Sequence, residues 1–233
     1  MAVIIVDSST IISCAMNCLM WVFDELSKKG IQFIVPKGVK KEIIDSGLHS
    51  KKFKYEAIRV SRYFSKGIFK ESEEEIKKET SEMLRYANSS FYIKHNPMRI
   101  LQKADAEVAV LAKKIKADAI ATDEKTLRLL VEAPDSIKKI LEKKFNSKVE
   151  VNEKELYNFN KEFKNIPVVR SVDLIALAYS MGIFEDTVKR FCPNRNRQCK
   201  MEIIDGLLYS LRFSGCAVSF KEIEDYVNIL ANK

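Results

Sequence analysis

The stretch from Lys103 to Glu124 constrains the fold most, because it joins a helical pattern directly to a strand pattern. Its first half repeats apolar residues at the helical period, which predicts a helix with one buried stripe made by Val108, Leu111, Ala112 and Ile115. Its second half is a short apolar run at residues 119–121 between two aspartates, which predicts a buried strand. The unit is typical of an α/β fold.

One aspartate lies near the start of the predicted helix, and another lies directly after the predicted strand. Asp105 lies in the first turn of the predicted helix, where acids are common because the helix dipole favours them, so it indicates little alone. Asp123 directly follows the predicted strand, and ligands of open α/β sheets bind at the carboxyl ends of strands. Two carboxylates at one crevice suggest a bound cation.

The N-terminus shows the same order of strand and acid. The β-branched run at residues 3–6 is typical of a central parallel strand, and Asp7 follows it. Asp7 could cap the helix that comes next, but Ser8, Ser9 or Thr10 could do so equally well. Capping therefore does not require an acid at this position.

A third acid follows the second predicted strand. Residues 32–35 form another short apolar run, and Glu42 lies on the short helix after it, again on the carboxyl side of the sheet. A single Glu at such a place is usually a surface residue, so Glu42 gains meaning only together with the other acids.

Residues 37–66 are strongly basic, with nine Lys and Arg residues against three acids and with aromatic residues interleaved. This mixture suits phosphate contacts and base stacking. An amphipathic helix with aromatic residues inward and lysines outward would give the same pattern. We expect nucleic-acid contacts from six of these lysines: Lys37, Lys40, Lys41, Lys51, Lys52 and Lys54.

The amino-acid composition indicates which binding partners and which cellular location to expect. The net charge of +8 favours an anionic partner, either nucleic acid or a membrane surface, although a lysine-rich solvated surface gives the same charge. No apolar run approaches the roughly 18 residues of a membrane span, and the N-terminus is unlike a signal peptide. We therefore expect no membrane contact. The five cysteines are expected to be reduced, which predicts a cytoplasmic protein.

The pattern changes near residue 170, after which only helical periodicity remains. We therefore predict an α/β domain at residues 1–165, with a central, mostly parallel sheet, and a small all-helical C-terminal extension at residues 166–233.

Four acids stand at strand ends or in first helical turns: Asp7, Glu42, Asp105 and Asp123. Together they predict an acidic crevice, in which like charges repel and raise one another's pKa. A divalent cation would relieve this repulsion. Mg²⁺ and Mn²⁺ prefer oxygen ligands, which suits carboxylates.

The segments around these acids resemble those of the PIN-domain nucleases. The matching segments are VIIVDSST around Asp7, VPKGVKKEI around Glu42, KADAEVAVLA around Asp105 and AIATDE around Asp123. The order and spacing of the acids are similar to that family, including its toxin nucleases, over about residues 1–165, and the tail resembles the helical extension of stand-alone archaeal-type members. The resemblance implies a three-layer α/β sandwich and metal-dependent endonucleolytic cleavage of single-stranded or structured RNA.

The resemblance and the chemistry together assign roles. Asp7, Asp105 and Asp123 are expected to hold Mg²⁺ or Mn²⁺, and Glu42 to bind a second ion or to orient the attacking water. Three hydroxyls are expected to hydrogen-bond the carboxylates or the phosphate: Ser8, Thr10 and Thr122. Two further acids, Glu107 and Glu124, lie near enough in sequence to join the site or else face solvent.

Other interpretations stay open at this stage. A haloacid-dehalogenase-type phosphatase also begins with a strand and an Asp, but it needs a second acid two residues later, where this chain has Ser9. A flap-type DNA nuclease shares the metal chemistry but usually has a denser acidic cluster. A catalytically silent RNA-binding or scaffold protein is the contrasting class, and the complete acidic quartet argues against it. A homodimer, an antitoxin or a ribonucleoprotein partner also stays open.

Overall fold

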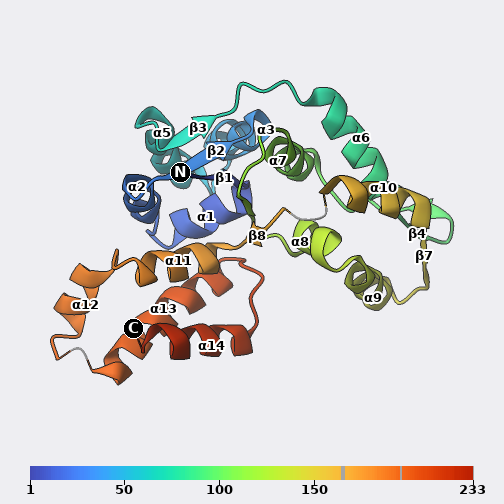
Figure 1. The fold of residues 1–233 in the computed structure, drawn as a ribbon. Coiled ribbons are helices and arrows are strands. Elements are labelled where there is room, and N and C mark those ends of the chain that lie inside the picture. The colour runs from blue at the N-terminus through green and yellow to red at the C-terminus, as the bar shows by residue number, and fades with distance from the viewer. Residues whose placement is uncertain (164–165, 195, 233) are drawn as a thin grey trace.

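The computed structural model describes residues 1–163, 166–194 and 196–232 and shows an α/β protein built around a parallel sheet (Figure 1). The five strands run in the order β3-β2-β1-β6-β8, and every neighbouring pair is parallel. Their bounds are Ala2–Val6 (β1), Ile31–Val35 (β2), Phe69–Glu71 (β3), Ala119–Ala121 (β6) and Val168–Val169 (β8). The predicted α/β fold with a central parallel sheet is confirmed.

The strand order reverses direction between β1 and β6. The chain moves from β1 through β2 to β3 at one edge of the sheet, then crosses to β6 and continues to β8 at the other edge. Right-handed crossovers place the connecting helices of these two halves on opposite faces of the sheet. The carboxyl ends of β1 and β6 therefore meet at a topological switch point, the place where open α/β sheets bind ligands.

Helices cover both faces of the sheet and make three layers (Figure 1). One outer layer contains α1 (Ser8–Met16), α2 (Trp21–Lys28) and α5 (Lys54–Ser65). The helix α7 (Lys103–Lys114) contacts β1 and β6 from the other side. The buried surface of α7 is wider than the predicted apolar stripe, because all residues from 105 to 112 are buried. The outer side of α7 is covered by α3 (Lys37–Lys41) and α6 (Lys77–Asn88).

Aromatic rings fill the core beside the edge of the sheet. Phe23 on α2 packs edge-to-face on Phe33 of β2 and on Phe69 of β3, with ring centroids 4.9 and 5.0 Å apart. Such pairs contribute about 0.5–1.5 kcal/mol beyond the burial of their area. They help to hold β2 beside β3, the two strands between which Glu42 and the basic segment lie in the sequence.

The connection after β2 is a series of short helical turns. It consists of α3, one turn of π-helix called η1 (Glu42–Ser46) and α4 (Gly47–His49), and it leads into α5. Single π turns are rare in proteins overall, but those that occur are often located at functional sites. The first residue of this turn is Glu42.

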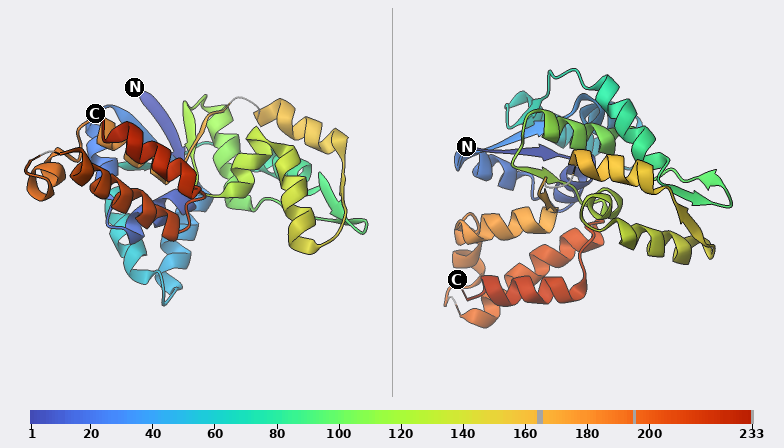
Figure 2. Two further views of the ribbon diagram at one scale, coloured as in Figure 1. Left: turned by 90° about the horizontal axis from the view of Figure 1, so that it is seen from below. Right: turned by 45° about the vertical axis from the view of Figure 1, so that its right-hand side comes forward.

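A second group of elements projects to one side of the sheet (Figure 2). It contains a small antiparallel sheet in the order β5-β4-β7, made of Phe91–Ile93 (β4), Asn96–Pro97 (β5) and Val149–Val151 (β7). Around it lie α6, α8 (Lys125–Glu132), α9 (Pro134–Phe145) and α10 (Glu153–Phe163). The pairing of β4 with β7 ties this arm together across a long stretch of sequence.

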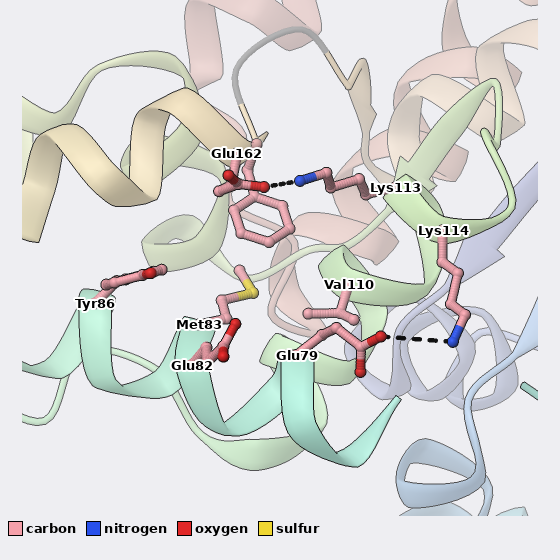
Figure 3. Close-up of a pocket in the computed structure, with 9 residues that line it drawn as sticks. Glu79, Glu82, Met83, Tyr86, Val110, Lys113, Lys114 and Glu162 are labelled. Carbon is pink, nitrogen blue, oxygen red and sulfur yellow. Dashed lines mark ion pairs between the residues drawn. The ribbon is translucent and has the colours of Figure 1, made fainter. Parts of the chain in front are cut away.

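A hollow of about 330 Å³ lies between α6, α7 and α10 (Figure 3). Met83 and Val110 line its apolar floor, and the ion pairs Lys113–Glu162 and Lys114–Glu79 lie at its rim. These pairs join α7 to α10 and to α6, so they connect the arm to the central layers.

Four helices form the C-terminal part: α11 (Ser171–Ser180), α12 (Glu185–Phe191), α13 (Arg197–Phe213) and α14 (Phe220–Leu230). The preceding strand β8 pairs with β6, so the helical part begins after it with α11. The predicted domain boundary falls at residue 165, which lies outside the described residues. Because α11 contacts α1 and α2, the extension packs directly against the layer that follows β1.

A buried arginine directly after β8 joins α11 to α14 and to the connection that precedes α14. Arg170 is 7% exposed, and it donates hydrogen bonds to Asp173, to the carbonyl of Ala217 and, at 2.7 Å, to Glu222.

In the described ranges no helix combines the length and the apolar character that crossing a membrane requires.

We expect Glu222→Gln to lower the free energy of unfolding by about 1 kcal/mol at neutral pH, a value discounted for solvent screening of this partly exposed group. Burial alone would raise the pKa of Glu222, but hydrogen bonds from Ser219 and Arg170 lower it to about 2 from 4.5. A depressed pKa stabilises the fold above 4.5, and this stabilisation is lost as the pH falls toward 2. Urea unfolding at successively lower pH should show the two proteins converge, whereas a constant difference would contradict the ionic role.

Candidate functional site

The carboxyl ends of the central strands border a cavity of about 410 Å³. Three of the four predicted acids line it: Asp7 after β1, Glu42 after β2 and Asp105 at the start of α7. Two further acids also line it, Glu107 on α7 and Glu124 after β6. The acidic crevice predicted at the strand ends is therefore present, with a partly different membership.

Asp7 is almost fully buried, at 1% exposure, and is held by hydroxyls on one oxygen only. Its Oδ2 accepts hydrogen bonds from Ser9 Oγ at 2.5 Å and from Thr122 Oγ1 at 3.0 Å. Its Oδ1 is also buried and has no hydrogen-bond partner among the described residues. An unpaired buried carboxylate oxygen is costly, so this atom is a candidate ligand for a cation.

Asp105 and Glu124 form a carboxyl pair beside Asp7. Asp105 Oδ2 accepts a 2.8 Å bond from the backbone N–H of Gln102, which caps α7, and its carboxyl is hydrogen-bonded to that of Glu124. Burial and then the charges of Glu124 and Asp7 raise the pKa of Asp105 from 3.8 to about 8. Burial likewise raises the pKa of Glu124, with contributions from Asp7 and Glu42. The pair therefore shares a proton near neutral pH.

Glu42 approaches the cavity from the π turn after β2. The residue is exposed overall, but its carboxyl is partly desolvated, and this burial together with the charges of Asp7 and Asp105 raises its pKa. The Ser8 hydroxyl bonds to it and opposes the rise. The pKa values of Glu42, Asp105 and Glu124 are thus all raised, and such shifts cluster at functional sites.

The prediction that Asp123 joins this cluster is wrong, and Glu124 takes its place. Asp123 is 3% exposed, and its two oxygens accept bonds from Ser171, one from the backbone N–H at 2.7 Å and one from the hydroxyl at 2.8 Å. Extended residues alternate in direction, so Thr122 and Glu124 lie on one side, toward Asp7, and Asp123 on the other, toward α11. The carboxylate of Asp123 therefore caps α11 and joins the extension to the sheet.

The predicted hydroxyl contacts are partly correct. Thr122 bonds Asp7, and Ser8 bonds Glu42, as expected. Thr10 does not, because its hydroxyl is buried without a hydrogen-bond partner in the described part of the chain. Ser9 fills this role instead, since its hydroxyl donates to Asp7 and accepts from the backbone N–H of Asp123 at 2.9 Å.

Basic side chains lie around the cavity. Of the six predicted lysines, Lys41 lines it, together with Arg99 and Lys103, which we did not predict. Lys40 is bound to Glu71 at 2.6 Å, and Lys37 lies 3.8 Å from Glu75, so these two are engaged with acids. The remaining three are exposed beyond η1: Lys51, Lys52 and Lys54. No signal in the helical pattern distinguished Arg99 or Lys103 from other surface cations.

Glu107 lines the cavity but is anchored to the backbone. Its Oε2 accepts a 2.8 Å bond from the N–H of Gly38 at the start of α3, and Lys103 lies 3.8 Å away. A Cβ at Gly38 would lie 2.2 Å from that oxygen. A side chain at position 38 would therefore displace the Glu107 carboxylate, which holds α3 against α7 beside the other acids.

We expect Gly38→Ala to lower the free energy of unfolding by about 1–3 kcal/mol, because the new methyl group displaces the Glu107 carboxylate from its bond. The matched control is Gly206→Ala on α13, where a Cβ meets nothing within 4 Å and the change should stabilise the helix by up to about 1 kcal/mol. Urea unfolding of both variants measures the effect, and equal stability of the two would contradict it.

The residues fit a divalent cation in charge and in ligand type. Carboxylate oxygens are what Mg²⁺ and Mn²⁺ prefer, and the unpaired Asp7 Oδ1 is a ligand atom without another partner. Among the described residues, no group of three or more His, Cys, Asp or Glu side chains is already arranged to hold a metal ion. The carboxyls of Asp105 and Glu124 bond each other, and they would separate to bind a cation.

Comparison with protein-family models, with curated proteins and with solved structures gives no match to this chain. The resemblance to the PIN-domain nucleases therefore stays a prediction that rests on the segments around the acids.

Proposed function

We propose that this protein is a Mg²⁺- or Mn²⁺-dependent endoribonuclease whose site is formed by Asp7, Glu42, Asp105 and Glu124. The observation that carries the proposal is the gathering of these carboxylates in one cavity at the switch point of the sheet. Burial, and then the charges of Glu124 and Asp7, raise the pKa of Asp105 to about 8, and the charge of a divalent cation would offset both effects.

Three carboxylates would hold the cation. Asp7 offers its unpaired Oδ1, and Asp105 and Glu124 offer the oxygens that now share a proton. When bound, Mg²⁺ or Mn²⁺ would act as a Lewis acid that polarises a phosphodiester. The bonds from Ser9 and Thr122 fix the orientation of Asp7, and the bond from Gln102 fixes Asp105, so these ligands are held in advance.

Glu42 is suited to move the proton of the attacking water. Its carboxyl has a raised pKa and lies on the more open side of the cavity, where a water can reach it. A base whose pKa is shifted toward the working pH transfers protons most effectively. The hydrogen bond from Ser8 would hold the carboxylate while it accepts the proton at one oxygen.

A nucleic-acid substrate is favoured by the cations around the cavity and by the net charge of +8, and the resemblance of the segments around the acids favours RNA. Lys41, Arg99 and Lys103 can each contact a phosphate next to the carboxylates, and phosphate neutralisation supplies much of the affinity of such proteins. The five free cysteines accord with the reducing cytoplasm, which is the location we propose.

The activity test uses purified protein with end-labelled single-stranded RNA, duplex RNA and DNA, each with Mg²⁺, Mn²⁺ or EDTA. We expect internal cleavage of RNA with either metal and none with EDTA. Binding of RNA without cleavage would favour the silent RNA-binding protein, and cleavage restricted to DNA would favour the flap-type nuclease.

Charge reversal at Lys51, Lys52 and Lys54 is expected to weaken RNA binding and to lower its salt dependence. Each phosphate contact to a single strand contributes about 0.7 to the slope of log affinity against log salt, so three lost contacts lower the slope by about 2. Reversal of Lys139, Lys143 and Lys144 on α9 changes the net charge equally and serves as the control. Equal slopes for the two triple variants would leave the first three lysines as solvated surface.

A further inference from the structure

A third hollow, of about 630 Å³, lies between the start of α8 and the connection from α13 to α14. Figure 1 shows this connection at the end of the helical extension that faces α8. One wall is formed by Lys125 and Arg128 of α8, and the other by residues 212–220 of the extension. The roles proposed above for the acidic cavity do not use this groove.

Exposed aromatic rings border the groove. Phe213 is 78% exposed and Phe220 is 52% exposed, although both are large apolar residues. Tyr209 stacks on Phe213 with ring centroids 6.0 Å apart, and it packs against Phe220 at 5.8 Å. Clustered apolar groups left in water mark a surface that binds something.

The charge beside these rings is positive. The guanidinium of Arg212 lies over the ring of Phe220, 3.9 Å from its centroid, and it also donates to the carbonyl of Val218. Lys125 and Arg128 face it across the groove, whereas the acid in the lining, Glu222, is paired with the buried Arg170. Flat aromatic and guanidinium surfaces with nearby cations are complementary to nucleotides, because bases stack on the former and phosphates pair with the latter.

The groove and the acidic cavity are lined by consecutive residues of the chain. Glu124 lines the cavity, and the next residue, Lys125, lines the groove. We infer that the groove binds an unstacked base of a single RNA strand whose phosphodiester lies at the carboxylates, with Phe213 and Phe220 as the stacking surface. This inference rests on the proposed function and adds to it the class of substrate, which is unpaired RNA, since a base within a duplex would first have to break its pairing and stacking to reach these rings.

The test measures fluorescence anisotropy of labelled oligoadenylate and of the same oligomer with abasic sites, in EDTA so that no cleavage occurs. We expect the wild-type protein to bind the base-bearing strand about 5–100-fold more tightly than the abasic one. Phe213→Ala should remove most of this preference, and Phe213→Tyr should restore it, because the ring is kept. Phe213 is exposed, so its replacement should leave urea unfolding unchanged.

The matched control is Phe145→Ala on α9. Phe145 is also exposed, at 45%, with Lys144 5.4 Å from its ring centroid, but it does not line the groove. This variant should keep the full preference for bases. Equal preference in Phe213→Ala and Phe145→Ala would overturn the inference.

Three further outcomes distinguish a failure of the groove inference from a failure of the proposed function. Equal binding of both strands by the wild-type protein overturns the stacking surface and leaves RNA cleavage standing. Binding of neither strand, with no cleavage in the activity test, overturns the groove and the proposed function together. A concentration-dependent dimer in light scattering that Phe213→Ala abolishes would assign the groove to a second copy of the chain and overturn the RNA inference.

Discussion

Glu124→Gln is expected to lower the rate of metal-dependent RNA cleavage by about a hundredfold or more. The change removes one ligand charge from a site in which the cation supplies several kcal/mol of transition-state stabilisation, and each 1.36 kcal/mol is tenfold in rate. Gln keeps the size of the side chain and can still bond Asp105, so the fold should be retained. Single-turnover cleavage rates at saturating Mn²⁺ measure the effect, with urea unfolding as the check on the fold.

Asp123→Asn is the matched control for this prediction, because the two residues are neighbours and both are acids. The carboxylate of Asp123 accepts two bonds from Ser171, and an amide would place a donor against one of them. We expect a loss of about 1.5–3 kcal/mol in the free energy of unfolding and a cleavage rate within a few-fold of wild type below the melting temperature. Loss of cleavage in a folded Asp123→Asn protein, with an active Glu124→Gln protein, would restore the assignment made from the sequence.

The second large effect is expected from Asp105→Asn, which should abolish cleavage and stabilise the metal-free protein. The pKa of Asp105 is raised from 3.8 to about 8, so the native state resists ionising it more than the unfolded state does. Stability of the wild-type protein therefore falls as the pH rises from 3.8 toward 8, and the neutral amide escapes this loss. Each kcal/mol recovered raises the Tm by about 2–4 °C in a protein of this size.

Thermal melting in EDTA and in Mn²⁺ over this pH range measures both parts of the prediction. Without metal, the advantage of Asp105→Asn should be absent near pH 4 and largest near pH 8. Adding Mn²⁺ should raise the Tm of the wild-type protein more than that of the variant, since a ligand stabilises only through its affinity for the native state. An equal metal-induced rise in both proteins, with equal activity, would remove Asp105 from the site.

The sequence predicted the layers of the fold because the strands and α7 carry strong apolar patterns. The β-branched run of β1 and the alanine-rich α7 have few alternatives to burial, and both were placed correctly. The extent of burial on α7 was not predicted, because the covering helices α3 and α6 come from distant parts of the chain. The extension's attachment through Arg170 and Asp123 is also a long-range contact that no local pattern shows.

The contacts around the cavity differ from the sequence prediction by one residue at two places. The choice between Asp123 and Glu124 depends on the direction of consecutive extended residues, and the bond of Thr122 to Asp7 shows that even-numbered residues face the cavity there. The sequence alone does not show which of these two acids faces Asp7, because the contact of Thr122 with Asp7 is not visible in it. The choice between Ser9 and Thr10 likewise depends on how α1 is rotated, because Thr10 faces the core with no exposed surface.

The most direct measurement of the central claim is an anomalous-scattering map from crystals grown with Mn²⁺. The account predicts a manganese peak in the cavity, in contact with Asp7 Oδ1 and with the carboxylates of Asp105 and Glu124 separated to bind it. No peak in the cavity at saturating Mn²⁺, or a peak held by Asp123 on the side of α11, would contradict it.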